Sequence, residues 1–147
     1  MIIRKGGKED LPHALELIKE LALFEKAPDQ VSNTLEMMKE DGFGTHAIFE
    51  FIVAEKEGLI LGMSLYYFRY STWKGKRLYL EDLIITQTQR GNGYGKLLFD
   101  RTLEVARETK CTGMDWQVLD WNEPAIEFYK SYKAELDSGW VNCRMEF

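Results

Sequence analysis

An α+β fold, or mixed α/β layer, is predicted by three features of the 147-residue sequence. Apolar residues between positions 9 and 25 recur at helical spacing, whereas aromatic and β-branched residues dominate positions 49–86 and are typical of paired strands. A glycine-rich stretch, QRGNGYGKLL at residues 89–98, then leads from a strand pattern into a helix pattern. Strands that are grouped together, followed by a single strand-to-helix crossover, favour this class.

The amino-terminal part begins with a short edge strand expected at residues 2–4. An amphipathic helix is predicted over residues 9–25, where Pro12 is tolerated in the first turn.

A second, shorter helix is expected to start at Asn33 or Thr34. Asn33 and Glu36 resemble a capping box, and Gly42 is expected to stop the helix.

Three strands in a meander are predicted at residues 49–56, 59–70 and 76–86. Glu57-Gly58, between the first two, is a hairpin signal. After the glycines, the pattern predicts a helix to about Thr109, a strand at 114–119, a helix at 124–132 that starts with a proline, and a final strand at 140–147.

Length and composition favour one globular domain over residues 1–147, in a soluble, cytoplasmic protein. The chain contains 45% hydrophobic residues, enough for one core, and no apolar run of membrane-spanning or signal-peptide length. Two cysteines and two histidines do not form a disulfide framework or a metal-ligand motif, so no metal is expected.

The negative charge lies in the first part of the chain. Residues 1–60 contain 7 basic and 12 acidic side chains, whereas residues 61–147 contain 12 of each. This distribution argues against nucleic-acid binding. It fits a small cationic substrate, or simply a solvated acidic face.

The glycine loop, residues 89–95, is predicted to bind an anion. Glycine allows positive φ, and free N–H groups at the start of a helix attract phosphate. A P-loop is excluded because Leu97 follows Gly95-Lys96 in place of Ser or Thr, and the dinucleotide fingerprint lacks its third glycine. The pattern that remains is Arg90-x-x-Gly93-x-Gly95, with a structural helix-entry turn as the alternative.

This loop resembles the pyrophosphate loop of the GNAT superfamily of N-acetyltransferases. The resemblance implies the GNAT-like acyl-CoA N-acyltransferase fold, with a central, mostly antiparallel sheet flanked by helices, and acetyl-CoA as cosubstrate. It also implies cofactor contacts from the preceding strand and from the loop, at Leu83, Ile84, Ile85, Arg90, Gly91, Asn92, Gly93, Tyr94, Gly95 and Lys96.

A second segment, DWNEPAIEFYK at residues 120–130, is similar to the family segment in which an asparagine caps a helix and contacts CoA. The match implies further cofactor contacts at Asn122, Glu123, Pro124 and Ala125, and makes Tyr129 the proton donor. Without the resemblance, Asn122 is a plausible N-cap and Tyr129 a core aromatic residue.

Four segments, KELALFEKAPDQV, EDGFG, YYFRYSTWKGKRLYLED and VLDWNEPAIEFYK, narrow the resemblance to the spermidine/spermine (diamine) acetyltransferase family. FEK-x-x-DQV, YSTWKG and VLDWN are most similar to its thialysine-acetylating branch. The family implies a homodimer and a small amine substrate. Whether a polyamine or thialysine is the acceptor stays open.

The resemblance implies that Glu81, in YLEDLII, is the acidic group that binds the amine and accepts its proton through water. An alkyl ammonium with a pKa of about 10.4 must lose a proton before it attacks, at a cost of about 4 to 5 kcal/mol at pH 7. The family match places the amine acceptor against Phe24, Glu25, Trp73, Glu81, Asp82, Asp115, Trp116 and Gln117. Read without the match, Glu81 and Asp82 are a surface pair at a strand end.

Three positions depart from the family pattern. Lys133 stands where a glycine follows the tyrosine helix, and Tyr132 stands where a basic CoA contact is expected. The segment ELDSGW is shorter than in the polyamine-acetylating relatives, and Asp137 is the only nearby candidate for the acidic residue that they have there, which weakens the case for polyamine recognition. A left-handed Lys133 would cost about 1 kcal/mol. Lys130 or Lys133 could replace the missing basic contact.

The main hypothesis is therefore an N-acetyltransferase in which the amine attacks acetyl-CoA directly in a ternary complex. The alternatives are an acetyltransferase for a protein or peptide amine and a noncatalytic acyl-CoA-binding module.

Overall fold

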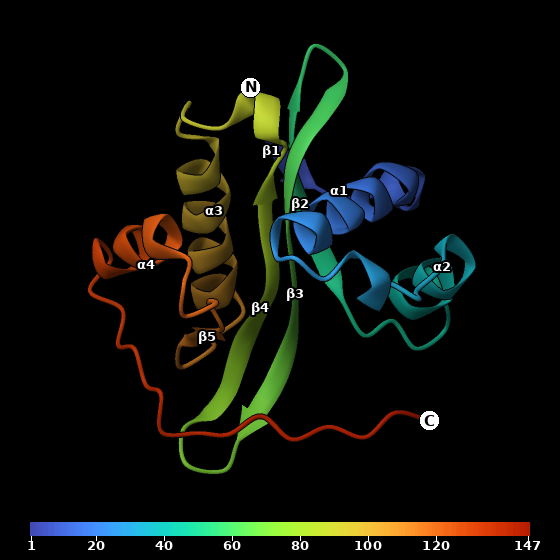
Figure 1. Cartoon of the computed structure of the whole chain (residues 1–147). Coiled ribbons are helices and arrows are strands. Elements are labelled where there is room, and N and C mark those ends of the chain that lie inside the picture. The colour runs from blue at the N-terminus through green and yellow to red at the C-terminus, as the bar shows by residue number, and fades with distance from the viewer. The chain divides into compact units, whose positions relative to one another are not determined.

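The computed structural model describes residues 1–147 and divides into two units, residues 1–116 and residues 117–147. The first unit contains the sheet and three helices, and the second contains one helix and the carboxyl-terminal segment (Figure 1).

One five-stranded sheet organises the first unit. Its strands follow their order in the chain, and every neighbouring pair is antiparallel except the last, which is parallel. The predicted α+β class, the edge strand and the meander are confirmed. The strands are β1 (Ile2–Lys5), β2 (Glu50–Lys56), β3 (Leu59–Ser71), β4 (Gly75–Ile85) and β5 (Met114–Trp116).

The turn between β2 and β3 has the predicted hairpin geometry. Glu57 and Gly58 both have positive φ, at 52° and 78°. Two residues with positive φ match the right-handed twist of the strands that they join.

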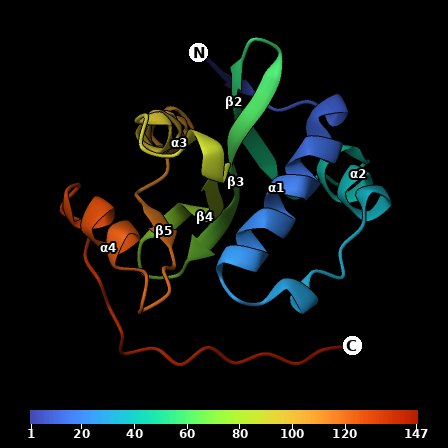
Figure 2. The ribbon, with the colours of Figure 1, turned by 45° about the horizontal axis from the view of Figure 1, so that its top comes forward.

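The helices of the first unit form a layer on each side of the sheet. Helices α1 (Leu11–Phe24) and α2 (Leu35–Phe43) cover one face, and α3 (Tyr94–Glu108) covers the other (Figures 1 and 2). Short 3-10 turns at Lys8–Asp10, Pro28–Gln30 and Gln87–Gln89 connect these elements. None of the helices is both long and apolar enough to span a membrane.

The sheet is buried on both faces, because alternate residues of each strand point to opposite sides. The face beneath α1 and α2 packs the core cluster Leu11, Ala14, Leu17, Met38, Phe51, Val53, Met63, Leu65 and Ile84. On the α3 side, the Ser64 and Thr102 hydroxyls share a buried hydrogen bond of 2.6 Å. Each buried apolar side chain contributes about 1.5 to 3 kcal/mol relative to exposure, so both helical layers are held mainly by burial.

The second helix differs from its predicted bounds. The Thr34 hydroxyl caps it by accepting a hydrogen bond from the Met37 N–H at 3.1 Å. The helix then continues through Gly42, and Gly44 forms its carboxyl-terminal cap. A glycine inside a helix costs only about 1 kcal/mol, so tertiary packing overrides the stop signal.

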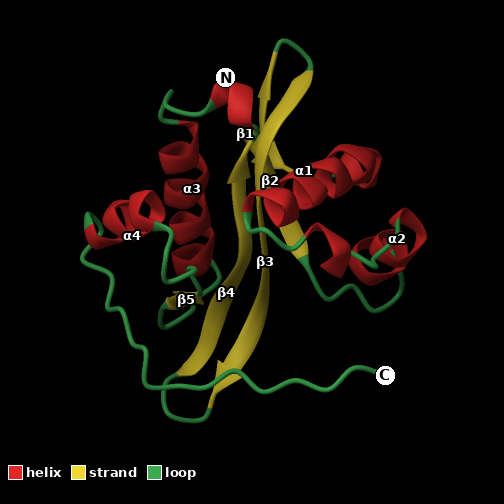
Figure 3. Cartoon of the chain, viewed as in Figure 1, coloured by secondary structure: helices red, strands yellow, loops and turns green.

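Two predicted strands were wrong in extent. β5 ends at Trp116, three residues earlier than expected, and the chain after Lys130 forms no strand at residues 140–147 (Figure 3). An alternating side-chain pattern is not sufficient for a strand, which also requires a partner for its main-chain groups.

The second unit contains α4 (Glu123–Lys130). Its predicted N-cap is confirmed: the Asn122 side-chain oxygen accepts a hydrogen bond from the Ala125 N–H at 3.4 Å. Pro124 lies in the first turn, where a missing N–H does no harm. The predicted helix over 124–132 ends at Lys130, two residues early.

Candidate active site

The glycine loop adopts a backbone that favours glycine at two positions. Gly91 has φ of 83° and Gly93 has φ of 79°, in the left-handed region that other residues rarely adopt. A Cβ atom at either residue would meet no atom within 4 Å. The backbone conformation therefore favours glycine at both positions, and the space beside each of them is open.

The same loop presents main-chain N–H groups at the start of α3. Gly93 is the N-cap and provides no side-chain cap, so the first amides of the helix have no intrahelical acceptor. The positive end of the helix dipole adds to their attraction for anions. The Asn92 side chain is used within the loop, where it donates to the Gln89 carbonyl at 3.1 Å. These features fit the diphosphate of a CoA thioester.

The Glu20 carboxylate of α1 binds two residues that precede the glycine loop. Glu20 accepts hydrogen bonds from the Gln87 N–H at 2.7 Å and from the Thr86 hydroxyl at 3.0 Å. Two of the predicted site residues meet nearby: the Arg90 guanidinium lies over the Phe24 ring, 5.0 Å from its centroid. Arg90 Nε also donates to the Ile85 carbonyl at 3.0 Å, which ties the loop to the end of β4.

The end of β4 is paired on one side only within the sheet. β5 pairs with Leu78–Leu80 and goes no further, whereas β3 pairs along β4 as far as Ile85. The strand segment 83–85 thus has one edge without a neighbouring strand. Such an edge is suited to hydrogen bonding with an extended amide-containing ligand, as in the pantetheine arm of CoA.

A bulge in β4 places two carboxylates on one pocket. Asp82 pairs with Leu65, and the next pair is Leu80 with Tyr66, so Glu81 is the extra residue. Successive side chains of a regular strand point to opposite faces, but a bulge changes this alternation and re-aims a side chain. Glu81 and Asp82 consequently line the same cavity.

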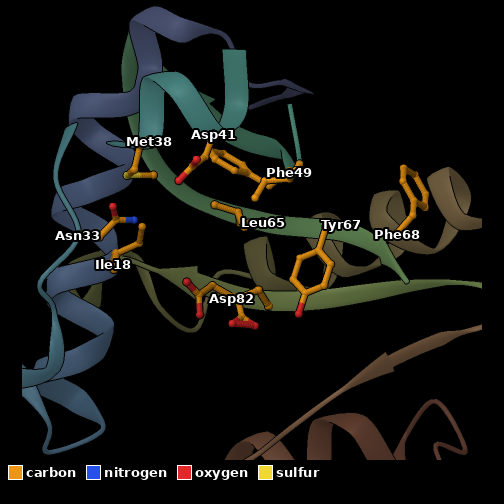
Figure 4. A pocket seen from close by; sticks show the side chains of 11 residues that line it. Ile18, Asn33, Met38, Asp41, Phe49, Leu65, Tyr67, Phe68 and Asp82 are labelled. Atoms are coloured by element: carbon orange, nitrogen blue, oxygen red, sulfur yellow. The ribbon is translucent and has the colours of Figure 1, made fainter. Parts of the chain in front are cut away.

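The cavity has a volume of about 500 Å³ and lies between α1, α2, β3 and β4, within the first unit. Figure 4 shows its side chains, among them the carboxylates of Asp41 and Asp82 and the aromatic rings of Phe49 and Tyr67. This size is typical of small-ligand sites. Its complete lining is Ile18, Asn33, Met38, Asp41, Ile48, Phe49, Leu65, Tyr67, Phe68, Glu81 and Asp82.

Electrostatics at the bulge favour a cationic ligand. Burial, together with the neighbouring Glu81 and Glu25 carboxylates, raises the pKa of Asp82 to about 7. Burial and the Glu81 charge also raise the pKa of the Tyr67 phenol. An ammonium group placed here would relieve the repulsion between these carboxylates.

Three of the predicted acceptor residues lie outside the cavity. Phe24 stacks on Arg90, and Glu25 acts on Asp82 only through its charge. Desolvation also raises the pKa of Glu25. Trp73 lies in the turn between β3 and β4 and is 86% exposed.

Strand β5 holds two more of the predicted residues in other contacts. Asp115 accepts hydrogen bonds from Arg77 at 3.0 and 2.8 Å, and this ion pair lowers the pKa of Asp115. The Trp116 ring packs edge-on against Phe99, with centroids 5.3 Å apart. The negative charge of Asp115 is therefore already balanced by Arg77.

The second unit contains the remaining predicted residues. Tyr129 lies near the end of α4, and its ring contacts Phe128 with centroids 5.5 Å apart. Asn122 and residues 123–125 form the cap and first turn of this helix. The Gln117 side chain donates to Asn142 at 2.9 Å.

Sequence reasoning missed Glu20, Asn33 and Asp41. Glu20 lies on the polar side of an amphipathic helix. Most residues on such a side are simply solvated, so the position of Glu20 in the sequence does not indicate a functional role. Asp41 belongs to the segment EDGFG, which supported the family resemblance without suggesting a role. Asn33 was interpreted only as part of a helix cap. The role of each of these three residues depends on which helices and strands pack against one another in the folded protein.

Comparison with known proteins shows the family of this chain. The model of the acetyltransferase (GNAT) family matches residues 14–132. Thialysine N-epsilon-acetyltransferase of Bos taurus is 38% identical, over 99% of this chain and 92% of its own length. Spermidine/spermine N(1)-acetyltransferase-like protein 1 of Homo sapiens is 36% identical over 94% of this chain, which corresponds to 21% of that longer protein.

Solved structures share the fold at lower sequence identity. An aminoglycoside N-acetyltransferase in complex with CoA superimposes with a TM-score of 0.78 at 15% identity, covering 99% of this chain and 95% of that chain. The family match spans most of the sequence and includes the glycine loop. The chain belongs to the acetyltransferase (GNAT) family and is an N-acetyltransferase.

Proposed function

We propose that this N-acetyltransferase transfers the acetyl group of acetyl-CoA to a primary amine of a small cationic acceptor. The observation that carries this proposal is the β4 bulge, which aims Glu81 and Asp82 into one cavity. Relatives named for thialysine and for spermidine or spermine support the same class of acceptor. Acetyl-CoA supplies the acetyl group as a reactive thioester.

The donor would bind to the glycine loop and to the open edge of β4. Amides of residues 91–96 would hold the diphosphate, and the main chain of Leu83, Ile84 and Ile85 would hold the pantetheine arm. Asn122 and the first turn of α4, at Glu123, Pro124 and Ala125, are proposed to add contacts. Their support is the resemblance of the segment DWNEPAIEFYK to the family.

The amine would be bound and activated by the carboxylates. Glu81 and Asp82 bind the ammonium group, and Glu81 then accepts its proton through water. The neutral nitrogen then forms the new N–C bond as the C–S bond breaks, and Tyr129 gives its proton to the departing thiolate. The second proton of the nitrogen leaves as the amide forms and returns to the Tyr129 phenolate through water. The intrinsic pKa of tyrosine is about 10, so the phenol holds its proton at pH 7.

Direct attack in a ternary complex requires no covalent acetyl-enzyme and no metal ion. Orientation of two bound reactants contributes about 7 to 11 kcal/mol in favourable cases, which exceeds the 4 to 5 kcal/mol needed to deprotonate the amine. Placement of the two reactants is thus expected to supply most of the rate enhancement.

The same proposal includes the domain organisation, the compartment and the assembly of the protein. We expect residues 1–147 to act as a single acetyltransferase domain, in a cytoplasmic homodimer that uses neither nucleic acid nor membrane. The family match, which runs across both units, supports the single domain.

The test is an acceptor panel assayed for CoA release from acetyl-CoA. The panel contains putrescine, spermidine, spermine, thialysine, lysine, ornithine and a lysine peptide. We expect turnover with one or more of the small amines. Turnover with the peptide alone would instead favour a protein acetyltransferase, and CoA binding without any turnover would favour a noncatalytic module.

A further inference from the structure

We infer that Asp41 determines acceptor specificity by binding a second ammonium group of the acceptor, at the opposite end of the cavity from Glu81 and Asp82. The inference rests on the proposed function and deepens it. It predicts an acceptor with two cationic ends joined by an apolar chain.

Acidic side chains line the cavity at two separate places. Asp41 is contributed by α2, whereas Glu81 and Asp82 are contributed by the bulge of β4. In Figure 4 the Asp41 carboxylate lies on the α2 side and the Asp82 carboxylate on the β4 side, with Leu65 between them in this view. The cavity thus has carboxylates contributed by two different layers of the fold.

The wall between the two carboxylates is apolar. Met38 and Leu65 are buried members of the core cluster, with exposures of 2% and 8%, and Ile18 and Phe49 pack against that cluster. Apolar side chains stabilise the methylene or thioether segment of a ligand but cannot solvate a charge. The lining therefore matches a ligand with charged ends and an apolar centre.

Asp41 lies at an electrostatically unfavourable position of its own helix. It lies in the last turn of α2, which contains no basic residue, at the end where the helix dipole disfavours an anion. Lys39, the nearest lysine of that helix, pairs instead with Glu36 at 3.6 Å. A carboxylate in this position gains nothing from its helix, and a bound ammonium group would supply the missing partner.

Asn33 adds a hydrogen-bond donor to the wall of the cavity and lies beside Ile18 in Figure 4. Its side-chain oxygen accepts from the Thr34 N–H at 2.9 Å, which directs the amide NH₂ away from that bond. An amide NH₂ group on the cavity wall can donate a hydrogen bond to the α-carboxylate of an amino acid. Diamino acids are thus expected to bind in this cavity at least as well as plain diamines.

The experiment compares matched acceptors that differ in one charge. The pairs are bis(2-aminoethyl) sulfide with 2-(ethylthio)ethylamine, and 1,5-diaminopentane with pentylamine. For the wild type, we expect kcat/KM to be about tenfold or more higher for the two-amine member of a pair, as a charged hydrogen-bonded contact predicts. Asp41→Asn should bring the two values to within about threefold, with an unchanged KM for acetyl-CoA.

Glu40→Gln is the matched control, because it removes the same charge from the neighbouring residue of α2, which does not line the cavity. It should keep the wild-type ratio. Asp41→Asn should also keep or raise the melting temperature, since the carboxylate is unfavourably placed in its helix.

Two results would overturn the assignment of Asp41: a wild-type ratio close to one, which needs no variant, or an Asp41→Asn enzyme that keeps the wild-type ratio. Either leaves the proposed function intact. Acetylation of no amine at all would overturn the proposed function together with this assignment.

Discussion

The Glu20 carboxylate of α1 accepts a 2.7 Å hydrogen bond from the backbone N–H of Gln87, immediately before the glycine loop. The same carboxylate accepts from the Thr86 hydroxyl. Through these bonds, a helix on one side of the sheet fixes the start of a loop that leads to the helix on the other side. Glu20 therefore positions the loop without itself lying in it.

Glu20→Ala is expected to lower both stability and CoA affinity. Loss of the acceptor removes the hydrogen bonds from the Gln87 N–H and the Thr86 hydroxyl, each of which contributes about 0.5 to 1.5 kcal/mol to the free energy of unfolding. The dissociation constant for CoA, measured by calorimetry, should rise several-fold as the loop loses its anchor. Glu20→Gln keeps one oxygen acceptor for Gln87 and should recover part of the affinity.

Glu16→Ala is the control for this prediction. Glu16 lies one helical turn earlier and makes only an exposed ion pair with Lys19, at 3.3 Å. Exposed pairs of this kind contribute about 0 to 1 kcal/mol. Equal effects of the two alanine substitutions on CoA binding would show that Glu20 has no positioning role.

Gly93→Ala tests the glycine loop directly. Alanine at φ of 79° should reduce the unfolding free energy by about 1 kcal/mol, and its methyl group would enter the open space assigned to the diphosphate. We expect a weaker affinity for CoA, by tenfold or more in calorimetry, on the order of 1.4 kcal/mol.

Gly58→Ala separates backbone strain from ligand contact. Gly58 has nearly the same φ, 78°, and equally open surroundings, but it lies in the β2–β3 turn. It should lose a similar amount of stability and bind CoA as the wild type does. If Gly93→Ala bound CoA with unchanged affinity, the diphosphate would have to lie elsewhere.

Asp82 makes stability depend on pH. Its pKa is about 7 in the folded protein and about 3.9 in the unfolded chain, so the unfolded state releases this proton first. The unfolding free energy should therefore fall as pH rises from about 4 to 7, by up to roughly 4 kcal/mol from this group. Asp82→Asn should remove this part of the slope in urea titrations, and parallel curves for the two proteins would contradict the prediction.

The same group should appear in the activity profile. An ammonium acceptor is held best when Asp82 is ionised, so kcat/KM for the amine should fall as pH drops below about 7. Asp82→Asn should lower kcat/KM at pH 8 and flatten this acid limb. A limb that keeps its midpoint in the variant would assign the titration to another group.

Tyr129→Phe separates proton donation from binding. Removal of the hydroxyl should reduce kcat by about 10²-fold or more, as for other general acids, and leave CoA affinity within about twofold. Tyr132→Phe, on the same chain segment, is the matched control and should keep the wild-type rate. Unchanged turnover in Tyr129→Phe would remove this residue from the proposed mechanism.

Local signals in the sequence predicted most of the fold correctly. The helical stripe of α1, the hairpin at Glu57-Gly58 and the N-cap at Asn122 each depend on neighbours within a few residues, so spacing alone revealed them. Lys133 stands where the family pattern has a glycine, and the structure gives it a left-handed φ of 60°. The glycine loop was recognised for the same reason, because its conformational requirement is written in consecutive residues.

The sequence by itself thus determined the class of fold, the backbone conformation of the glycine loop and the family. Only the tertiary structure decided which side chains share the cavity. The β4 bulge aims Glu81 and Asp82 together, Arg77 neutralises Asp115, and α2 brings Asp41 to the far end of the cavity. These outcomes depend on strand register and on contacts between distant segments, whose energies no local pattern encodes.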